Sequence, residues 1–296
     1  MRKIVILGCG WLGQQLGMAF AAKGHRVIGT RQSQAGCLSL PQGIEGLQLS
    51  LPSPELPVTL LEDAVVIVAL PASMPNYLDA IAQITEVGVC ARTVIFCSST
   101  GIYAGLSGVV SEDLVATQQL TPKENEVKLN DLDIARAVVK THVERSRLNR
   151  IQRLMAAELL IRQLGNTVVI RLAGLIGPSR HPARFCQHGP LRGADLPVNL
   201  VHSADIARYL LMLLAQESVA EIHGSVVNLC SPEHPSKQQF YPQACLHAQM
   251  PAPQFETTSL PAELPKIIDV ERSLAFAGFS YQFANPLAAL PACLPY

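Results

Sequence analysis

Three glycines near the N-terminus, Gly8, Gly10 and Gly13, have the spacing Gly-x-Gly-x-x-Gly. They directly follow the apolar run Ile4–Leu7 and precede an amphipathic stretch, residues 14–23. A strand, this glycine pattern and then a helix are typical of a loop that holds the pyrophosphate of a dinucleotide. The first glycine permits a tight turn, the second lets the backbone approach the phosphates, and the third lets the helix pack closely on the strand. The phosphates would lie at the positively polarised N-terminus of the helix. The cofactor contacts predicted from this loop are Gly8, Gly10, Trp11, Leu12 and Gly13.

The end of the second expected strand, Arg26–Thr30, indicates which coenzyme is bound. A carboxylate there would accept hydrogen bonds from the ribose hydroxyls and select NAD, but residues 24–40 contain no acid. Arg31 can instead face a 2′-phosphate, with hydrogen bonds added by Thr30 or Ser33. We therefore expect NADP to be preferred, with NAD as the alternative. If Arg31 is only an exposed surface residue, it has no role in selecting the coenzyme.

A second polar loop follows the expected strand Thr93–Cys97, with the sequence Ser98-Ser99-Thr100-Gly101-Ile102-Tyr103. Parallel α/β sheets bind their ligands at the carboxyl ends of the strands. Hydroxyl groups at this place can bond a substrate carbonyl or a nicotinamide carboxamide. The alternative is a hydroxyl-rich turn without chemistry, which the position of the loop makes the weaker interpretation.

Together these motifs resemble the extended short-chain dehydrogenase/reductase superfamily of NAD(P)-dependent epimerases and dehydratases, and within it the YeeZ-like subgroup. The matching segments of the superfamily are residues 8–13, 98–103, 171–178 and 198–205. Those of the subgroup are residues 177–185, 240–243 and 266–269. Ser99, four residues before Tyr103, falls on the active-site serine of the superfamily.

The resemblance also implies further site residues. Cofactor contacts are implied for Ala69, Leu70, Pro71, Ser98, Leu172 and Ala173. Substrate contacts are implied for Thr100, Gly174, Arg180, His181 and His202. Arg180, together with Arg184, is suited to an anionic group such as a phosphate, and a solvated loop is the alternative. Asp205 is expected to cap a helix that begins at Ile206.

The chain departs from the superfamily at the catalytic Tyr-x-x-x-Lys, in which the lysine lowers the pKa of the tyrosine so that it acts as a base. No tyrosine lies between Tyr103 and Tyr209. Counting forward from Ser99 leads to Glu124-x-x-x-Lys128, the less favoured alignment.

Counting back from the strand at residues 167–171 leads to Asn149-x-x-x-Arg153, which we prefer because that helix must end beside the strand. Residues 121–148 would then be an extra, charge-rich stretch. Arg153 can hold a ribose hydroxyl in place of the lysine, whereas asparagine cannot serve as the base. Tyr103 is the leading substitute base, and His142 is a weaker one.

These motifs need a framework of alternating strands and helices, which predicts an α/β fold with a Rossmann-type, doubly wound parallel sheet. We expect a nucleotide-binding domain at residues 1–176, with strands returning from about 198–230, and a smaller C-terminal substrate lobe at 177–296. A long helix is expected over Asn130–Gly165, with Gly165 as its C-cap. The expected strands are Ile4–Leu7, Arg26–Thr30, Gly46–Leu51, Ala64–Leu70, Thr93–Cys97, Thr167–Arg171 and Val226–Leu229.

Composition narrows the function classes. The 296 residues have zero formal net charge and no basic cluster, which argues against nucleic acid as a ligand. No membrane span or secretory signal is expected. The eight cysteines lack metal-binding spacing and indicate reduced thiols in a cytoplasmic protein.

Two hypotheses follow for the function. One is an epimerase/dehydratase-like oxidoreductase acting on a nucleotide sugar or another phosphorylated small molecule, with a homodimer implied by the resemblance. The other is a redox-inactive sensor or scaffold that binds NADP(H) and has lost the catalytic tyrosine.

Overall fold

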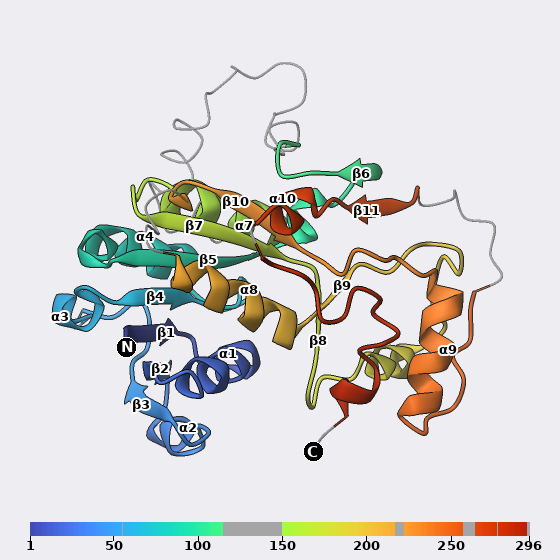
Figure 1. Ribbon diagram of the computed structural model, residues 1–296, viewed down its shortest axis with the longest axis horizontal. Helices are drawn as coiled ribbons and strands as arrows, with labels where there is room; N and C mark the ends of the chain where they lie inside the picture. The colour runs from blue at the N-terminus through green and yellow to red at the C-terminus, as the bar shows by residue number, and fades with distance from the viewer. Residues whose placement is uncertain (55, 115–149, 217–221, 257–263, 277, 295–296) are drawn as a thin grey trace. The chain divides into compact units, whose positions relative to one another are not determined.

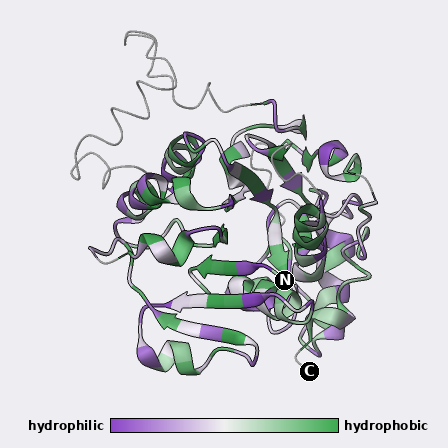
Figure 2. Cartoon of the chain, turned by 60° about the vertical axis from the view of Figure 1, so that its left-hand side comes forward, coloured by the Kyte–Doolittle hydropathy of each residue, from purple (hydrophilic) through white to green (hydrophobic). Residues whose placement is uncertain are grey.

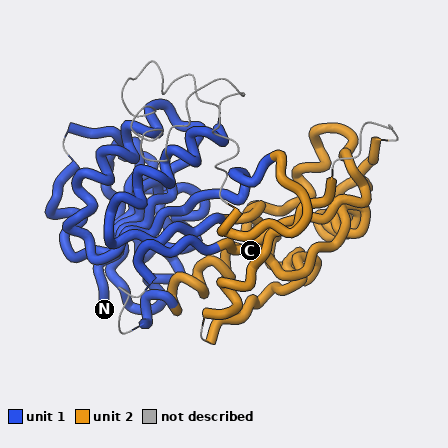
Figure 3. Tube along the Cα trace, turned by 90° about the horizontal axis from the view of Figure 1, so that it is seen from above, with its two compact units in different colours: residues 1–104, 115–171, 213–227 blue, residues 105–114, 172–212, 228–296 orange. Residues whose placement is uncertain are grey.

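The computed structural model describes residues 1–54, 56–114, 150–216, 222–256, 264–276 and 278–294 (Figure 1). These residues form two compact units, coloured separately in Figure 3. Unit 1 contains the described parts of residues 1–104, 115–171 and 213–227, and unit 2 those of 105–114, 172–212 and 228–296. The domain boundary expected at residue 176 stays a prediction; in the structure residues 105–114 and 172–176 fall in unit 2.

The largest sheet has seven strands in the order β10-β7-β5-β4-β1-β2-β3. β1 pairs in parallel with both β2 and β4, so that Ile4 lies opposite Val27 on one side and Val65 on the other. The fold is therefore the predicted Rossmann-type doubly wound sheet, whose order reverses between β1 and β4. Its strands are β1 (Lys3–Leu7), β2 (Arg26–Arg31), β3 (Ile44–Gln48), β4 (Val65–Val68), β5 (Thr93–Ser99), β7 (Thr167–Leu172) and β10 (Val226–Leu229).

Helices connect and cover these strands. α1 packs on β1, β2 and β3, while α4 packs on α7, which in turn contacts β5. The helices are α1 (Trp11–Ala21), α2 (Gln34–Leu38), α3 (Val58–Leu61), α4 (Tyr77–Val87), α7 (Arg150–Ile161), α8 (Ser203–Ala215), α9 (Lys237–His247) and α10 (Glu271–Leu274). Short 3₁₀ turns are η1 (Gly88–Cys90), η2 (Thr100–Tyr103), η4 (Pro182–His188) and η6 (Pro291–Cys293).

β4, next to β1 in the sheet, is apolar along its whole length, and Figure 2 shows long apolar stretches in several strands. All four residues of β4, Val65 to Val68, are buried. A parallel strand covered on both faces needs such a continuous apolar run rather than an alternating pattern. This is why the short sequence Val-Val-Ile-Val was sufficient to predict a central strand.

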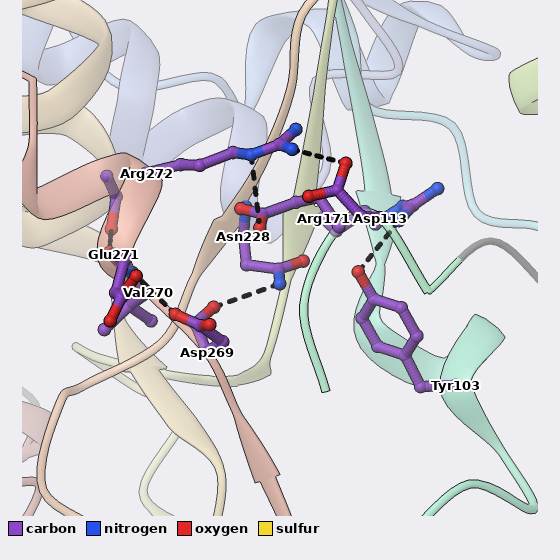
Figure 4. A network of polar contacts seen from close by, with 10 residues as sticks. Tyr103, Asp113, Arg171, Asn228, Asp269, Val270, Glu271 and Arg272 are labelled. Atoms are coloured by element: carbon purple, nitrogen blue, oxygen red, sulfur yellow. Dashed lines mark hydrogen bonds and ion pairs between the residues drawn. The ribbon is translucent and has the colours of Figure 1, made fainter. Parts of the chain in front are cut away.

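Unit 2 is built on two small parallel sheets. β8 (Gly174–Ile176) pairs with β9 (Leu200–His202), and β6 (Gly108–Val110) pairs with β11 (Lys266–Ile268). Polar contacts tie its segments together: Arg272 Nη2 lies 2.5 Å from Asp113 Oδ1, and Asn228 Nδ2 donates to the Asp269 carbonyl at 3.0 Å (Figure 4). Its apolar core includes Ile176, Leu200, Phe240, Ala289 and Leu290.

Three local predictions need correction. The third strand, expected over Gly46–Leu51, spans Ile44–Gln48. It begins at Ile44, which is 9% exposed and pairs with Val27 of β2. Gly165 is not the C-cap of α7, which ends at Ile161, four residues earlier. The expected part of that helix before residue 150 lies outside the described residues.

Asp205 does not cap a helix that begins at Ile206. α8 begins at Ser203, so Asp205 lies in its first turn. Its carboxylate instead accepts hydrogen bonds from the backbone N–H groups of Gln282 and Phe283 at 2.5 and 3.3 Å. Burial raises the pKa of Asp205 to about 6. Within the described part of the chain, no helix has the length and apolar character needed to cross a membrane.

Candidate functional site

The glycine loop after β1 is shaped by two glycines that the protein itself requires. Gly8 has a φ of +85°, and a Cβ there would lie 2.8 Å from the Leu70 side chain and 3.1 Å from the Ala69 carbonyl oxygen. A Cβ on Gly13 would lie 3.0 Å from Ile6, so α1 packs on β1 only with glycine at this position.

Gly10 differs from its two neighbours because a Cβ there would meet no atom within 4 Å. Its φ of −74° is open to any residue, and it is the N-cap of α1 without a side-chain cap. The N–H groups in the first turn of a helix have no partner within the helix. Open space at the N-terminus of a helix that has no side-chain cap fits a bound pyrophosphate. Trp11 and Leu12 begin α1 at this place.

The end of β2 holds the loop in position. Thr30 is buried, and its Oγ1 accepts a hydrogen bond from the Gly8 N–H at 2.9 Å. Arg31 Nη1 donates to the Cys9 carbonyl at 2.9 Å, which brings its guanidinium against the loop. Ser33 caps α2 by accepting from the Gly36 N–H at 3.2 Å. Thr30 therefore supports the loop, and Arg31 is the cation beside it.

The end of β4 lies next to the same loop. Ala69 donates its N–H to the Leu7 carbonyl at 2.9 Å, and the half-buried Leu70 and exposed Pro71 follow. β1 and β4 are the two strands between which the strand order reverses, and open α/β sheets bind ligands at that point. The structure thus brings the residues predicted after β1, β2 and β4 into one neighbourhood of unit 1.

A buried polar network lies at the end of β5. Ser98 Oγ donates to Glu158 Oε1 at 2.5 Å, and the same carboxylate pairs with Arg171, Nη2 to Oε2, at 2.7 Å. Arg171 Nη1 donates to the Tyr103 hydroxyl at 2.8 Å (Figure 4). Although burial opposes its charge, the hydrogen bonds and negative charge of Glu158 raise the pKa of Arg171. The side chains of Ser98 and Tyr103, at the two ends of this loop, are thus linked through Glu158 and Arg171.

The individual residues of this loop differ in access. Tyr103 is 0% exposed, and Thr100 is buried. Ser99 is half-buried, and its Oγ accepts from the Gly101 N–H at 3.1 Å, which leaves its own hydroxyl proton to donate. Among these hydroxyl groups, that of Ser99 is therefore the one placed to reach a ligand.

The helix residues considered in place of Tyr-x-x-x-Lys are only partly described. Arg153 is half-buried on α7, and its Nε is a buried donor with no hydrogen-bond partner among the described residues. Asn149, Glu124, Lys128 and His142 lie outside those residues.

Sequence reasoning did not find the network of Ser98, Glu158, Arg171 and Tyr103. A signal was nevertheless present, because Glu158 stands in the apolar run Leu154–Ile161 and Arg171 stands in the buried strand β7. Opposite charges that stand singly in two buried elements predict an ion pair. Sequence reasoning also did not single out Tyr77. Burial and the charge of Glu158 raise the pKa of the Tyr77 hydroxyl.

The remaining predicted cofactor and substrate residues belong to unit 2. Leu172 and Ala173 are buried, and the Ala173 N–H donates to the Leu229 carbonyl at 3.0 Å. Gly174 is exposed, but a Cβ there would lie 2.7 Å from Leu200. The chain therefore needs glycine at this position for packing.

Two arginines of unit 2 lie close enough to affect each other. Burial, followed by the charge of Arg184, lowers the pKa of Arg180. Arg180 Nε donates to the Leu175 carbonyl at 3.0 Å, and Arg184 Nη1 donates to the Ser179 carbonyl at 3.4 Å. Two neighbouring guanidinium groups of this kind favour an anionic ligand.

The two predicted histidines of unit 2 are buried. Each Nδ1 accepts a backbone N–H from two residues further on, His181 from Ala183 and His202 from Ala204, both at 3.2 Å. Burial lowers the pKa of both imidazoles, so the two rings are neutral at neutral pH, and their role in substrate binding stays a prediction. Across the described ranges, no group of three or more His, Cys, Asp or Glu side chains is arranged to hold a metal ion.

The fold and the glycine loop define a Rossmann-type α/β protein. UDP-glucuronic acid 4-epimerase from Bacillus cereus, solved with UDP-glucuronic acid and NAD, has a similar structure. Its TM-score is 0.70 at 17% identity, over 98% of this chain and 97% of that one. WbmH from Bordetella bronchiseptica, solved with NAD⁺, gives a TM-score of 0.71 at 15% identity, over 99% of this chain and 97% of that one.

The sequence comparison identifies the family. The chain is 32% identical to Protein YeeZ of Escherichia coli K12 over 303 residues, which cover 97% of this chain and 98% of that protein. No protein-family model matches the chain. The chain belongs to the YeeZ family.

Proposed function

We propose that unit 1 binds a nicotinamide coenzyme, NADP(H) in preference to NAD(H), for epimerase/dehydratase-like redox chemistry. The observation that carries the proposal is the open space at Gly10 beside the uncapped N-terminus of α1. The similar structures solved with NAD support the class of coenzyme. When bound, such a coenzyme donates or accepts a hydride. The residues that would hold it are Gly8, Gly10, Trp11, Leu12, Gly13, Arg31, Ala69, Leu70 and Pro71.

The preference for NADP rests on Arg31. Replacing it with aspartate is expected to weaken NADP⁺ binding about tenfold or more, because a charge-assisted bond to the 2′-phosphate is lost and a like charge is introduced. NAD⁺ binding should change less, so the ratio of the Kd for NAD⁺ to the Kd for NADP⁺ falls. Isothermal titration calorimetry with both coenzymes measures the ratio.

Arg162→Asp is the matched control, because it makes the same change of charge at an exposed residue just after the end of α7. If the Kd ratio of Arg31→Asp equals that of Arg162→Asp, Arg31 does not select the coenzyme.

For the substrate, we propose a phosphorylated small molecule such as a nucleotide sugar. The neighbouring cations Arg180 and Arg184 support an anionic group on the ligand, and one of the similar structures holds UDP-glucuronic acid. Ser99 would donate its hydroxyl proton in a hydrogen bond to the reacting substrate oxygen. Arg153, with its buried Nε, would hold a ribose hydroxyl.

Ser99→Ala tests the catalytic part of the proposal. We expect turnover to fall about a hundredfold, as for loss of one hydrogen-bond donor to a reacting oxygen, while the coenzyme Kd stays unchanged. The measurement is NADPH absorbance with carbonyl compounds and nucleotide sugars. Thr85→Ala is the control, because the Thr85 hydroxyl bonds within its own helix, to the Ile81 carbonyl. Equal turnover in the two variants would exclude Ser99 from catalysis.

A second function is binding without turnover, as a sensor of NADP(H) or a scaffold. The burial of Tyr103, whose hydroxyl is held by Arg171, favours it, because a phenol so enclosed does not reach a substrate. Tight coenzyme binding by a protein that turns over none of these compounds would support this second function. The proposal also includes a cytoplasmic location, inferred from the cysteine usage, and a homodimer, inferred from the family resemblance.

A further inference from the structure

Unit 2 contains a groove of about 920 Å³, and two of the residues that line it, His247 and Leu290, interact with His181. Its walls are α9, the loop after β10 and the segment that includes Asn285 and Leu290. The volume is within the range of small-molecule sites, roughly 300–1,000 Å³. Every residue that lines it belongs to unit 2.

One backbone carbonyl of α9, that of Gln238, lacks the donor that the regular helix pattern would supply. Pro242 lies inside α9 and has no N–H, so it cannot donate to the Gln238 carbonyl four residues earlier. Both residues line the groove. The side chain of Gln238 is held elsewhere, because its Nε2 donates to Asp195 Oδ1 at 2.6 Å. Pro242 thus leaves a hydrogen-bond acceptor on this wall.

His234 supplies a second acceptor. Its Nδ1 lies 3.2 Å from the Val198 carbonyl, and because a carbonyl can only accept, the proton is on Nδ1. Burial lowers the pKa of His234, with this hydrogen bond opposing the shift, so the ring is neutral at neutral pH. Nε2 is then an acceptor.

Glu233 supplies a third acceptor and the negative charge. Its Oε2 accepts from Asn285 Nδ2 at 2.8 Å, which orients the carboxylate and leaves lone pairs on both oxygens. The described lining includes no lysine or arginine to neutralise it. The groove therefore combines three acceptors, one of which is a carboxylate with no lysine or arginine among the described lining residues.

We propose that this groove binds a small ligand through a primary ammonium group. An ammonium group has three N–H donors and no acceptor, which complements the Gln238 carbonyl, His234 Nε2 and the Glu233 carboxylate. Linear diamines and aminosugars share this chemistry. The site is independent of the coenzyme loop.

Calorimetric titration of the full chain with putrescine and with glucosamine tests the proposal. We expect saturable 1:1 binding of at least one of them, and no binding of its neutral counterpart, N,N′-diacetylputrescine or N-acetylglucosamine. Binding of putrescine alone assigns a linear diamine, and binding of glucosamine alone assigns an aminosugar. Failure of both amines to bind, or equal binding of the acetylated compounds, overturns the proposal.

Two variants test the groove itself. Glu233→Gln is expected to weaken amine binding about tenfold or more through loss of the charge, whereas Glu271→Gln, an exposed carboxylate outside the groove, should bind like the wild type. Pro242→Ala supplies the missing N–H to the Gln238 carbonyl and is expected to weaken binding about threefold without loss of thermal stability. If Glu233→Gln or Pro242→Ala binds as the wild type does, the three-acceptor site is wrong.

Discussion

Replacing Glu158 with glutamine is expected to lower the free energy of unfolding by about 3–5 kcal/mol, because it leaves a buried arginine without its counter-charge. Arg171 has a side chain that is only 2% exposed, and its partner carboxylate also accepts the hydrogen bond from Ser98. Loss of the charge leaves two buried donors with a weaker acceptor. Urea unfolding followed by circular dichroism measures the change.

Two further variants separate the ion pair from its surroundings. Glu45→Gln removes the carboxylate of the exposed Arg26–Glu45 pair, whose side chains are 56% and 54% exposed, and should change stability little. The double replacement Glu158→Leu with Arg171→Met should recover much of the stability, because apolar side chains of similar volume replace both charges. If Glu158→Gln is as stable as Glu45→Gln, the buried pair does not hold the end of β5 in place.

Gly10→Val is expected to abolish coenzyme binding, a loss of at least a hundredfold in affinity (about 2.7 kcal/mol), and to leave the fold intact. A Cβ at Gly10 meets no protein atom within 4 Å, and its φ of −74° suits valine, so the protein tolerates the side chain. The same open space is where the pyrophosphate would lie. Calorimetry with NADP⁺, NADPH, NAD⁺ and NADH gives the affinity, and the melting temperature reports the fold.

Gly165→Val is the matched control for this prediction, since a Cβ at Gly165 also meets nothing within 4 Å but lies after α7. It should bind coenzyme as the wild type does. Gly13→Val should instead destabilise the fold, because its Cβ would press on Ile6 at 3.0 Å. Unchanged coenzyme affinity in Gly10→Val would remove the loop from the proposed site.

The strands and the glycine loop could be predicted because their signals are local. β10 has the bounds that the apolar run Val226–Leu229 indicated, and Gly8 has the positive φ that a tight turn after β1 requires. The start of β3 was missed because its position depends on the pairing of Ile44 with Val27 on another strand. For the same reason the role of Asp205 was misjudged, since its partners are more than seventy residues away.

The amino-acid sequence by itself determined the order of the elements, the position of the glycine loop and the likeness to the YeeZ family. Spacing along one strand and one helix carries that information. Only the tertiary structure decided that Ser98, Glu158, Arg171 and Tyr103 form one buried unit, and that Tyr103 is enclosed while Ser99 is accessible. The physical reason is that burial and charge pairing depend on which elements pack together, and Ser98 and Glu158, like Tyr103 and Arg171, are 60 or more residues apart in the sequence.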